Sequence, residues 1–272
     1  MTNHAAQLAI IKHVTRGQAD SITLNLNSPF AIPHDFTANY VEYVKDFSQK
    51  NVIGNASGWE TIVLPFDVQK VSHEEKGLLT PFGVSGSEHH FWLGEFSGTA
   101  FKQASVMKAH TPYIIAFPNN DDYEPASCIS GSITFSADHA TVHATTDVPA
   151  VKGTDFNFVP IYKKVFKAPG RFMLNTYDTS GSEPAGSTFQ NNKMSLRPFG
   201  AYMQNSHNLM APQKFPIRFE ANEDEASDAP AASAIYSPDG RLMRSVDEAA
   251  SSDTHGLSRG IYISGGKKII IR

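Results

Sequence analysis

The sequence predicts an all-β protein: an antiparallel β-sandwich or jelly-roll main domain, followed by a small C-terminal β-hairpin or immunoglobulin-like unit. Short segments rich in β-branched and aromatic residues recur along the chain, which is typical of strands. Turn-forming residues separate them at intervals of about 8–15 residues, a spacing found in sandwiches and jelly rolls. We find no alternation of strand and helix patterns, so a parallel α/β fold is not expected. With 272 residues, 40% of them hydrophobic, the chain can bury a large core.

The main domain is predicted to be organised around residues 58–66, Gly-Trp-Glu-Thr-Ile-Val-Leu-Pro-Phe. Its run of three aliphatic residues, with aromatic residues on both sides, favours a strand buried on both faces. Trp59 and Leu64 are therefore expected to lie in the main core. Pro65 cannot donate a backbone hydrogen bond, so we expect the strand to end or bulge there.

The remaining elements follow from alternation and from turn residues. Residues 1–20 are weakly patterned and are predicted to form an N-terminal arm, with the main domain over residues 21–220. Residues 36–47 also carry apolar residues at helical spacing, and strand is preferred for their β-branched and aromatic content. Residues 132–135 and 140–145 are expected to pair as a hairpin around the turn Ala137-Asp138-His139. Further strands are predicted at 21–26, 89–96, 111–117, 156–162, 171–174, 196–202 and 215–219.

A boundary is predicted near residue 220. Residues 221–233 are acidic and rich in alanine, which is typical of a linker. Residues 234–272 then form a small β unit, because two alternating segments flank the tight turn Gly265-Gly266. A hairpin alone is marginally stable, so we expect a strand at Ile235-Tyr236 to support it.

The charge and cysteine content limit the partners. Lys and Arg number 23 and Asp and Glu 27, so the formal net charge is −4 and binding to nucleic acid is not expected. The single cysteine, Cys128, excludes an internal disulfide and a cysteine-based zinc cluster. No apolar run approaches the roughly 20 residues of a transmembrane helix. No signal peptide is recognisable, so we expect either a cytoplasmic protein or a natural N-terminus that has been trimmed.

Several segments together resemble a β-rich module found near the C-termini of secreted and surface proteins of Bacteroidetes. Residues 58–66 match its W-x-T-[LI]-x-L-P-F pattern, and three further marks follow the family's order. These are Phe36-Thr37-Ala38, Thr111-Pro112-Tyr113-Ile114-Ile115 and Pro198-Phe199-Gly200-Ala201-Tyr202. The tail is similar to a shortened type IX secretion sorting domain. The resemblance implies export, an extracellular or cell-surface location and no catalytic residues.

Two groups of side chains are candidates for ligand contacts. Phe91 and Trp92 could form an aromatic platform for sugar stacking, with a core position as the alternative. A loop rich in oxygen ligands contains Asn119, Asp121, Asp122 and Glu124, which predicts a weak calcium site or a solvated turn. Apart from calcium, no cofactor is expected.

A second metal hypothesis involves His139 and His143, whose even spacing places both on one face of a strand. Asp138 or Asp147 could contribute a further ligand, and the alternative is a solvated strand face. Gly-x-Ser-x-Gly elbows and glycine-rich phosphate loops are lacking in the sequence. We therefore expect a non-catalytic module with a binding role, for a glycan or an extracellular protein, or an adhesive or structural role. A hydrolase whose acid pair cannot be recognised from sequence is the alternative.

Overall fold

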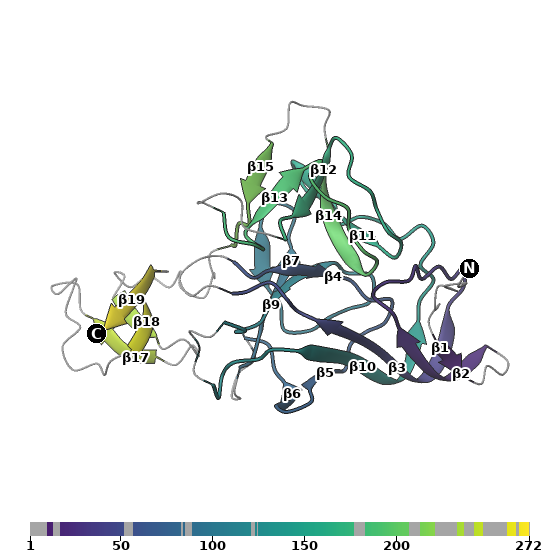
Figure 1. Ribbon diagram of the computed structural model, residues 1–272, viewed down its shortest axis with the longest axis horizontal. Helices are drawn as coiled ribbons and strands as arrows, with labels where there is room; N and C mark the ends of the chain where they lie inside the picture. Colours follow the sequence, from purple (N-terminus) through teal and green to yellow (C-terminus); the bar gives the residue numbers. More distant parts are fainter. Residues whose placement is uncertain are drawn as a thin grey trace, which may run out of the picture. The chain divides into compact units, whose positions relative to one another are not determined.

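The computed structural model describes residues 10–12, 17–51, 57–82, 84, 89–120, 123, 125–176, 183–206, 213–220, 233–236, 242–246, 260–264 and 267–271. All regular secondary structure within these ranges is β-strand, which confirms the predicted fold class (Figure 1). Accordingly, none of the described segments is a helix that could span a membrane. The chain divides into two compact units, Met1–Glu220 and Ala221–Arg272.

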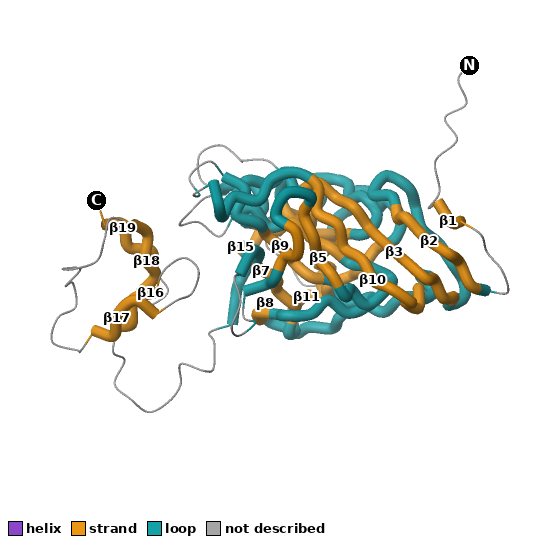
Figure 2. The backbone as a smooth tube through the Cα atoms, turned by 90° about the horizontal axis from the view of Figure 1, so that it is seen from below, coloured by secondary structure: helices purple, strands orange, loops and turns teal. Residues whose placement is uncertain are grey.

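The largest sheet of the first unit is built on two long antiparallel strands. β3 (Phe36–Asp46) and β10 (Ser132–Val142) pair along almost their whole length and lie side by side in Figure 2. β2 (Gln18–Leu24) joins β3 in parallel, a departure from the purely antiparallel expectation. The sheet order is β1-β2-β3-β10-β5-β6, completed by β1 (Ile10–Lys12), β5 (Lys70–His73) and β6 (Gly77–Leu79).

Two further sheets complete the first unit, and all their pairs are antiparallel. One has the order β4-β9-β7-β8, formed by β4 (Glu60–Ile62), β9 (Tyr113–Ala116), β7 (Trp92–Phe96) and β8 (Phe101–Gln103). The other has the order β11-β14-β12-β13-β15, formed by β11 (Phe156–Ile161), β14 (Gly200–Asn205), β12 (Arg171–Leu174), β13 (Thr188–Asn191) and β15 (Lys214–Pro216).

The sheet containing β9 lies between the other two, so the first unit has three layers (Figure 1). Successive side chains of a strand point to opposite faces of its sheet. Tyr113 and Ile115 accordingly join the core cluster shared with β3 and β10, whereas Ile114 and Ala116 join the cluster shared with β12 and β13. All four are buried, which explains why this strand is apolar at every position.

Residues 58–66 are buried as predicted, with Trp59 8% and Leu64 2% exposed. Only Glu60–Ile62 form a strand, β4, which is the end strand of the middle sheet. Beyond β4, the Val63 N–H donates to the Phe199 carbonyl at 3.0 Å, so this segment packs between layers. The strand ends before Pro65, in agreement with the sequence.

The hairpin predicted within residues 132–145 is wrong, because Ser132–Val142 form the single strand β10. Asp138 pairs with Tyr40 of β3 on one side. On the other side, its N–H donates to the Gln69 side chain at 3.1 Å. At the position of the predicted turn, the only turn-like feature of this strand is the left-handed backbone of His139, with φ of 48°.

The second unit is one antiparallel sheet. Its order is β17-β16-β18-β19, formed by β16 (Ser233–Tyr236), β17 (Leu242–Val246), β18 (Gly260–Ser264) and β19 (Lys267–Ile271). The predicted terminal hairpin is confirmed by the pairing of β18 with β19, and Ile235 and Tyr236 pair with β18. The turn Gly265-Gly266 and most of the predicted linker lie outside the described residues.

Candidate functional site

The structure separates the two aromatic residues predicted to bind a ligand. Phe91 is 1% exposed and stacks on Phe117 at 5.3 Å, so its ring belongs to the core and has no free face for a sugar. Trp92 points to the other side of the sheet and is half-buried. Its ring stacks on Phe82 at 4.8 Å and lies 6.5 Å from Tyr123. Phe91 therefore takes the core position that was its alternative, whereas Trp92 as a ligand contact stays a prediction, with Phe82 and Tyr123 as its aromatic neighbours.

The predicted calcium loop is only partly described. Asp121, Asp122 and Glu124 lie outside the described residues. Asn119 is 2% exposed, and its amide nitrogen donates to the carbonyls of Phe47 and Gln49. Its side-chain oxygen accepts the backbone N–H of residue 51 at 2.9 Å. Asn119 thus anchors the chain after β3, and the calcium site remains a prediction.

The histidines form a different arrangement from the one predicted. His143 lies against His110, with 5.8 Å between ring centroids, and its Nδ1 is 2.9 Å from a carboxylate oxygen of Asp35. His139 is exposed on β10. His110 Nδ1 is 2.7 Å from the Tyr162 hydroxyl. Among the described residues, no group of three or more His, Cys, Asp or Glu side chains could hold a metal ion.

This cluster fixes several segments to one another. The N–H groups of His110 and His143 donate to the carbonyls of Leu64 and Pro65, at 2.8 and 2.7 Å. The backbone N–H that follows His143 donates to Asp35 and, together with the His143 ring, lowers the pKa of the Asp35 carboxyl. Burial and the neighbouring His143 lower the pKa of His110, so its imidazole is neutral near pH 7. These contacts indicate a structural clamp around the end of the buried 58–66 segment.

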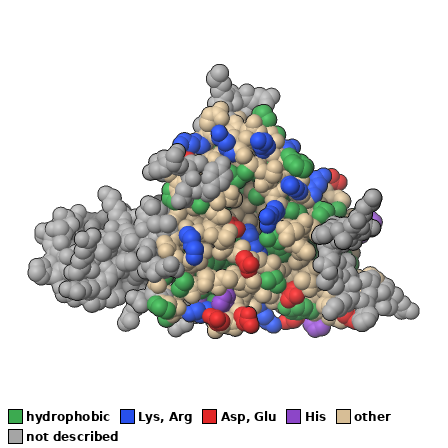
Figure 3. Space-filling model, in the orientation of Figure 1, with side chains coloured by type: hydrophobic (Ala, Val, Ile, Leu, Met, Phe, Trp, Pro, Cys, Tyr) green, Lys and Arg blue, Asp and Glu red, His purple; other side chains and the backbone are tan. Residues whose placement is uncertain are grey.

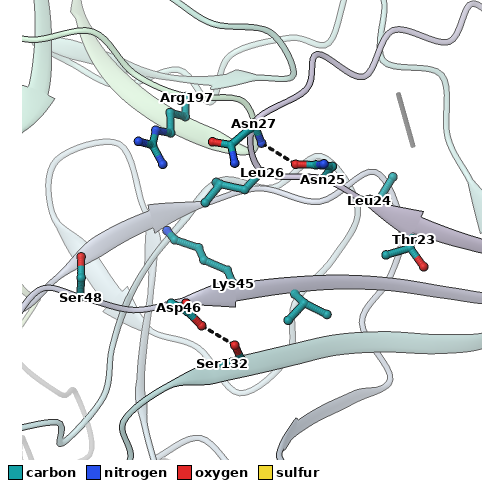
Figure 4. Close-up of a pocket in the computed structure, with 11 residues that line it drawn as sticks. Thr23, Leu24, Asn25, Leu26, Asn27, Lys45, Asp46, Ser48, Ser132 and Arg197 are labelled. Atoms are coloured by element: carbon teal, nitrogen blue, oxygen red, sulfur yellow. Dashed lines mark hydrogen bonds between the residues drawn. The ribbon is translucent and has the colours of Figure 1, made fainter. Parts of the chain in front are cut away.

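A groove of about 540 Å³ lies on the first unit (Figure 4). This volume lies within the usual range for small-molecule sites, roughly 300–1,000 Å³. The end of β2 and the following turn form one side, and the end of β3 with the start of β10 forms the other. Its lining residues are Thr23, Leu24, Asn25, Leu26, Asn27, Val44, Lys45, Asp46, Ser48, Ser132 and Arg197.

The turn after β2 is set by Asn25. Its side-chain oxygen accepts the Asn27 N–H at 2.8 Å, and its carbonyl accepts the Ser28 N–H at 3.2 Å. Asparagine favours such turns because its side chain can replace a backbone acceptor. The turn places the Asn27 amide beside Arg197 on one side of the groove, while Asp46 and Ser132 lie on the other (Figure 4).

A largely buried ion pair fixes the β3 side of the groove. Lys45 Nζ is 2.8 Å from a Glu60 oxygen, and the two side chains are 10% and 15% exposed. The other Glu60 oxygen accepts the N–H groups of Ser48 and Gln49 at 3.0 and 3.2 Å. Lys45 also lies over the Phe47 ring at 4.6 Å. Because β3 and β4 belong to different sheets, this pair ties two layers together beside the groove.

The groove differs from the sites predicted from sequence, because its residues come from segments more than 170 positions apart in the chain. Arg197 is exposed, and its guanidinium has no hydrogen-bond or ion-pair partner among the described residues. Asp46 accepts a hydrogen bond from the Ser132 hydroxyl. The lining thus combines hydroxyl, amide and charged groups with the aliphatic side chains Leu26 and Val44. Such a surface can bind a polar molecule that also has apolar patches.

Comparisons with known proteins leave the family open. No protein-family model matches the chain, and neither a curated protein nor a solved structure gives a match. The resemblance to a module of secreted Bacteroidetes proteins therefore stays a prediction.

Proposed function

We propose that the unit Met1–Glu220 is a non-catalytic binding module of the cell surface or extracellular space, and that it binds a glycan in the groove. The observation that carries the proposal is the composition of the groove lining. A sugar presents hydroxyl groups at its edge and C–H groups on its faces. Asn27, Ser132 and Asp46 offer hydrogen-bond partners for the hydroxyls, whereas Leu26 and Val44 offer aliphatic surface for the C–H groups.

The rigidity of the site also supports binding. The Lys45–Glu60 ion pair and the turn at Asn25 hold two sides of the groove in place before a ligand arrives. A preformed site loses less conformational entropy on binding than a flexible one. The aromatic cluster around Trp92 belongs to a different part of the first unit, and it provides an alternative surface to test.

A hydrolase is less well supported than a binding module. Glycoside hydrolysis needs two available carboxyl groups, about 5–10 Å apart, on either side of the scissile bond. Asp46 is the one carboxylate among the described lining residues, and Glu60, which contacts the lining residues Lys45 and Ser48, is engaged by Lys45, Ser48 and Gln49. Glu60 is therefore poorly placed to exchange a proton with a sugar.

The test is a glycan array probed with the full chain, the groove-filling variant Val44→Trp and the matched variant Leu78→Trp. Val44 is 37% exposed in the groove, and Leu78 is 64% exposed on β6 of the same sheet, so both can take a larger side chain at the surface. We expect Val44→Trp to lose glycan binding and Leu78→Trp to retain it. Equal binding by both variants would refute the groove, and release of shorter sugars from a bound glycan would favour the hydrolase.

A further inference from the structure

The charges of the first unit are unevenly distributed along the sequence. Residues 151–220 contain nine Lys and Arg against four Asp and Glu, whereas residues 1–150 contain eight against fifteen. Figure 3 shows the consequence on one face. Basic side chains prevail in its upper part, where Figure 1 places the sheet of β11 to β15, and most of the acidic ones lie lower. The modest net charge of the chain therefore conceals a basic region.

Part of this region consists of two loops joined by one isolated antiparallel bridge, which we call the ribbon. Val165 and Leu196 form an antiparallel bridge, with N–H to carbonyl distances of 3.0 and 2.8 Å in the two directions. Residues that flank such a bridge face each other across it, so Lys164 lies opposite Arg197. Five exposed basic residues lie on the two segments that this bridge joins, and we call them the basic strip: Lys163, Lys164, Lys167, Lys193 and Arg197. Within the described part of the chain, no acidic side chain pairs with any of them.

An exposed aromatic ring lies within the basic strip. Phe166 is 63% exposed, and Lys164 Nζ is 5.2 Å from its ring centroid. Arg171 donates to the Phe166 carbonyl at 3.0 Å, and its guanidinium lies over the Tyr202 ring at 5.8 Å. These contacts hold the ribbon against the sheet while the lysine side chains stay in solvent.

Arg197 belongs both to the basic strip and to the lining of the groove. The two features are therefore continuous at this residue. The two sides of the groove also differ in charge, because Arg197 lies with Asn27 on one side and Asp46 lies with Ser132 on the other (Figure 4). An acidic group is attracted to the Arg197 side, and the Asp46 side can accept hydrogen bonds from hydroxyl groups.

We infer that the ligand is a carboxylated polysaccharide: one sugar carboxylate binds Arg197 in the groove, and neighbouring acidic sugars extend along the basic strip. This inference rests on the proposed function and specifies its ligand class. The planar fork of a guanidinium matches a carboxylate with two parallel hydrogen bonds, which an ammonium group cannot reproduce. Such a ligand also satisfies the hydroxyl-binding groups opposite Arg197.

Nucleic acid fits this surface less well. Single strands are bound through several aromatic side chains that stack on successive bases, and the described part of the basic strip offers only Phe166.

The experiment is calorimetric titration of the full chain with polygalacturonate, pullulan, heparin and oligo(dT). The variants are Arg197→Gln, Lys164→Gln and, as a charge-matched control, Lys102→Gln, which removes an exposed lysine of β8. We expect polygalacturonate to bind best and more weakly as salt rises. Arg197→Gln should weaken it by roughly tenfold or more, the usual scale for a charge-assisted hydrogen bond. Lys164→Gln should have a smaller effect, and Lys102→Gln none.

Each other result is decisive. Binding of pullulan as tight as that of polygalacturonate, or equal effects of Arg197→Gln and Lys102→Gln, would overturn the acidic-ligand inference and leave glycan binding intact. Tighter binding of heparin than of polygalacturonate would show that the site recognises sulfate groups and would overturn the carboxylate assignment. Tighter binding of oligo(dT) with the same dependence on Arg197 would make the surface a nucleic-acid site. If none of the glycans tested here and none on the array binds, both the inference and the proposed function fail.

Discussion

Replacement of Glu60 by Gln tests how much the buried ion pair beside the groove stabilises the first unit. Glutamine keeps the size of the side chain and one oxygen that can accept the N–H groups of Ser48 and Gln49. It removes the negative charge 2.8 Å from Lys45, whose side chain is 10% exposed. Lys45 is then left charged, poorly solvated and without its partner.

The expected cost follows from that geometry. Loss of a hydrogen bond to a charged group costs about 1.5–3 kcal/mol, and an unpaired charge left in a buried site raises the cost to about 3–5 kcal/mol. Because Lys45 lies at the edge of a groove and can partly rehydrate, we expect about 2–3 kcal/mol for Glu60→Gln. The measurement is urea unfolding of the full chain, monitored by tryptophan fluorescence. The slope of the free energy of unfolding against urea concentration should be unchanged.

A double-mutant cycle separates the pair from other effects. Lys45→Met alone leaves the Glu60 carboxylate without its cation and should destabilise the unit. Lys45→Met combined with Glu60→Gln should recover part of the lost free energy of unfolding. The control is Lys70→Gln, because the Lys70–Asp138 pair has a similar distance of 2.7 Å but side chains that are 55% and 46% exposed. A loss for Glu60→Gln as small as that for Lys70→Gln would refute the claim that burial makes this pair matter.

Three further predictions test the core and the histidine cluster. Leu64→Ala should cost about 2–5 kcal/mol in urea unfolding, and less than about 1 kcal/mol would mean that the segment is peripheral. Gly186→Ala should cost more than Gly170→Ala: both glycines have positive φ, but only at position 186 would the new Cβ lie 2.4 Å from the Trp59 backbone nitrogen. Equal midpoints in urea would contradict this. Because the pKa of His110 is lowered on folding, stability should fall as pH drops below about 6.5, the unfolded value. His110→Asn, which tolerates the φ of 61°, should flatten that dependence in thermal unfolding, and an unchanged slope would contradict it.

The sequence predicted elements best where the local pattern and the tertiary environment agree. β9 is apolar at every position because both of its faces are covered, and β12 was predicted with its observed ends. β10 was predicted as a hairpin because Ala137-Asp138-His139 resembles a turn. The ladder with β3 and the hydrogen bonds with Gln69 outweigh that local preference, which residue periodicity cannot reveal.

The burial of a segment was easier to predict than the identity of the strands beside it. The pattern of residues 58–66 correctly indicated a buried segment, but it contained no information on which strands would flank it. The same limit applies to the groove. Asn27, Lys45 and Arg197 carry no mutual spacing signal, because the turn after β2, the end of β3 and the ribbon meet only in the folded chain. Phe91 and Trp92 were predicted together, and strand alternation alone already places them on opposite faces.

The Glu60→Gln variant also distinguishes a groove that binds its ligand through charge from one that binds it through shape alone. In the native protein the charge of Lys45 is neutralised by Glu60, so Arg197 is the cation available to a ligand. Removal of Glu60 frees a second positive charge in the groove lining. Affinity for polygalacturonate should therefore rise while stability falls, whereas Arg197→Gln should lower affinity with little change in stability, since its side chain is exposed. If Glu60→Gln weakens polygalacturonate binding while the variant remains folded at the temperature of titration, the ion pair acts by shaping the groove, and the electrostatic account of the ligand is refuted.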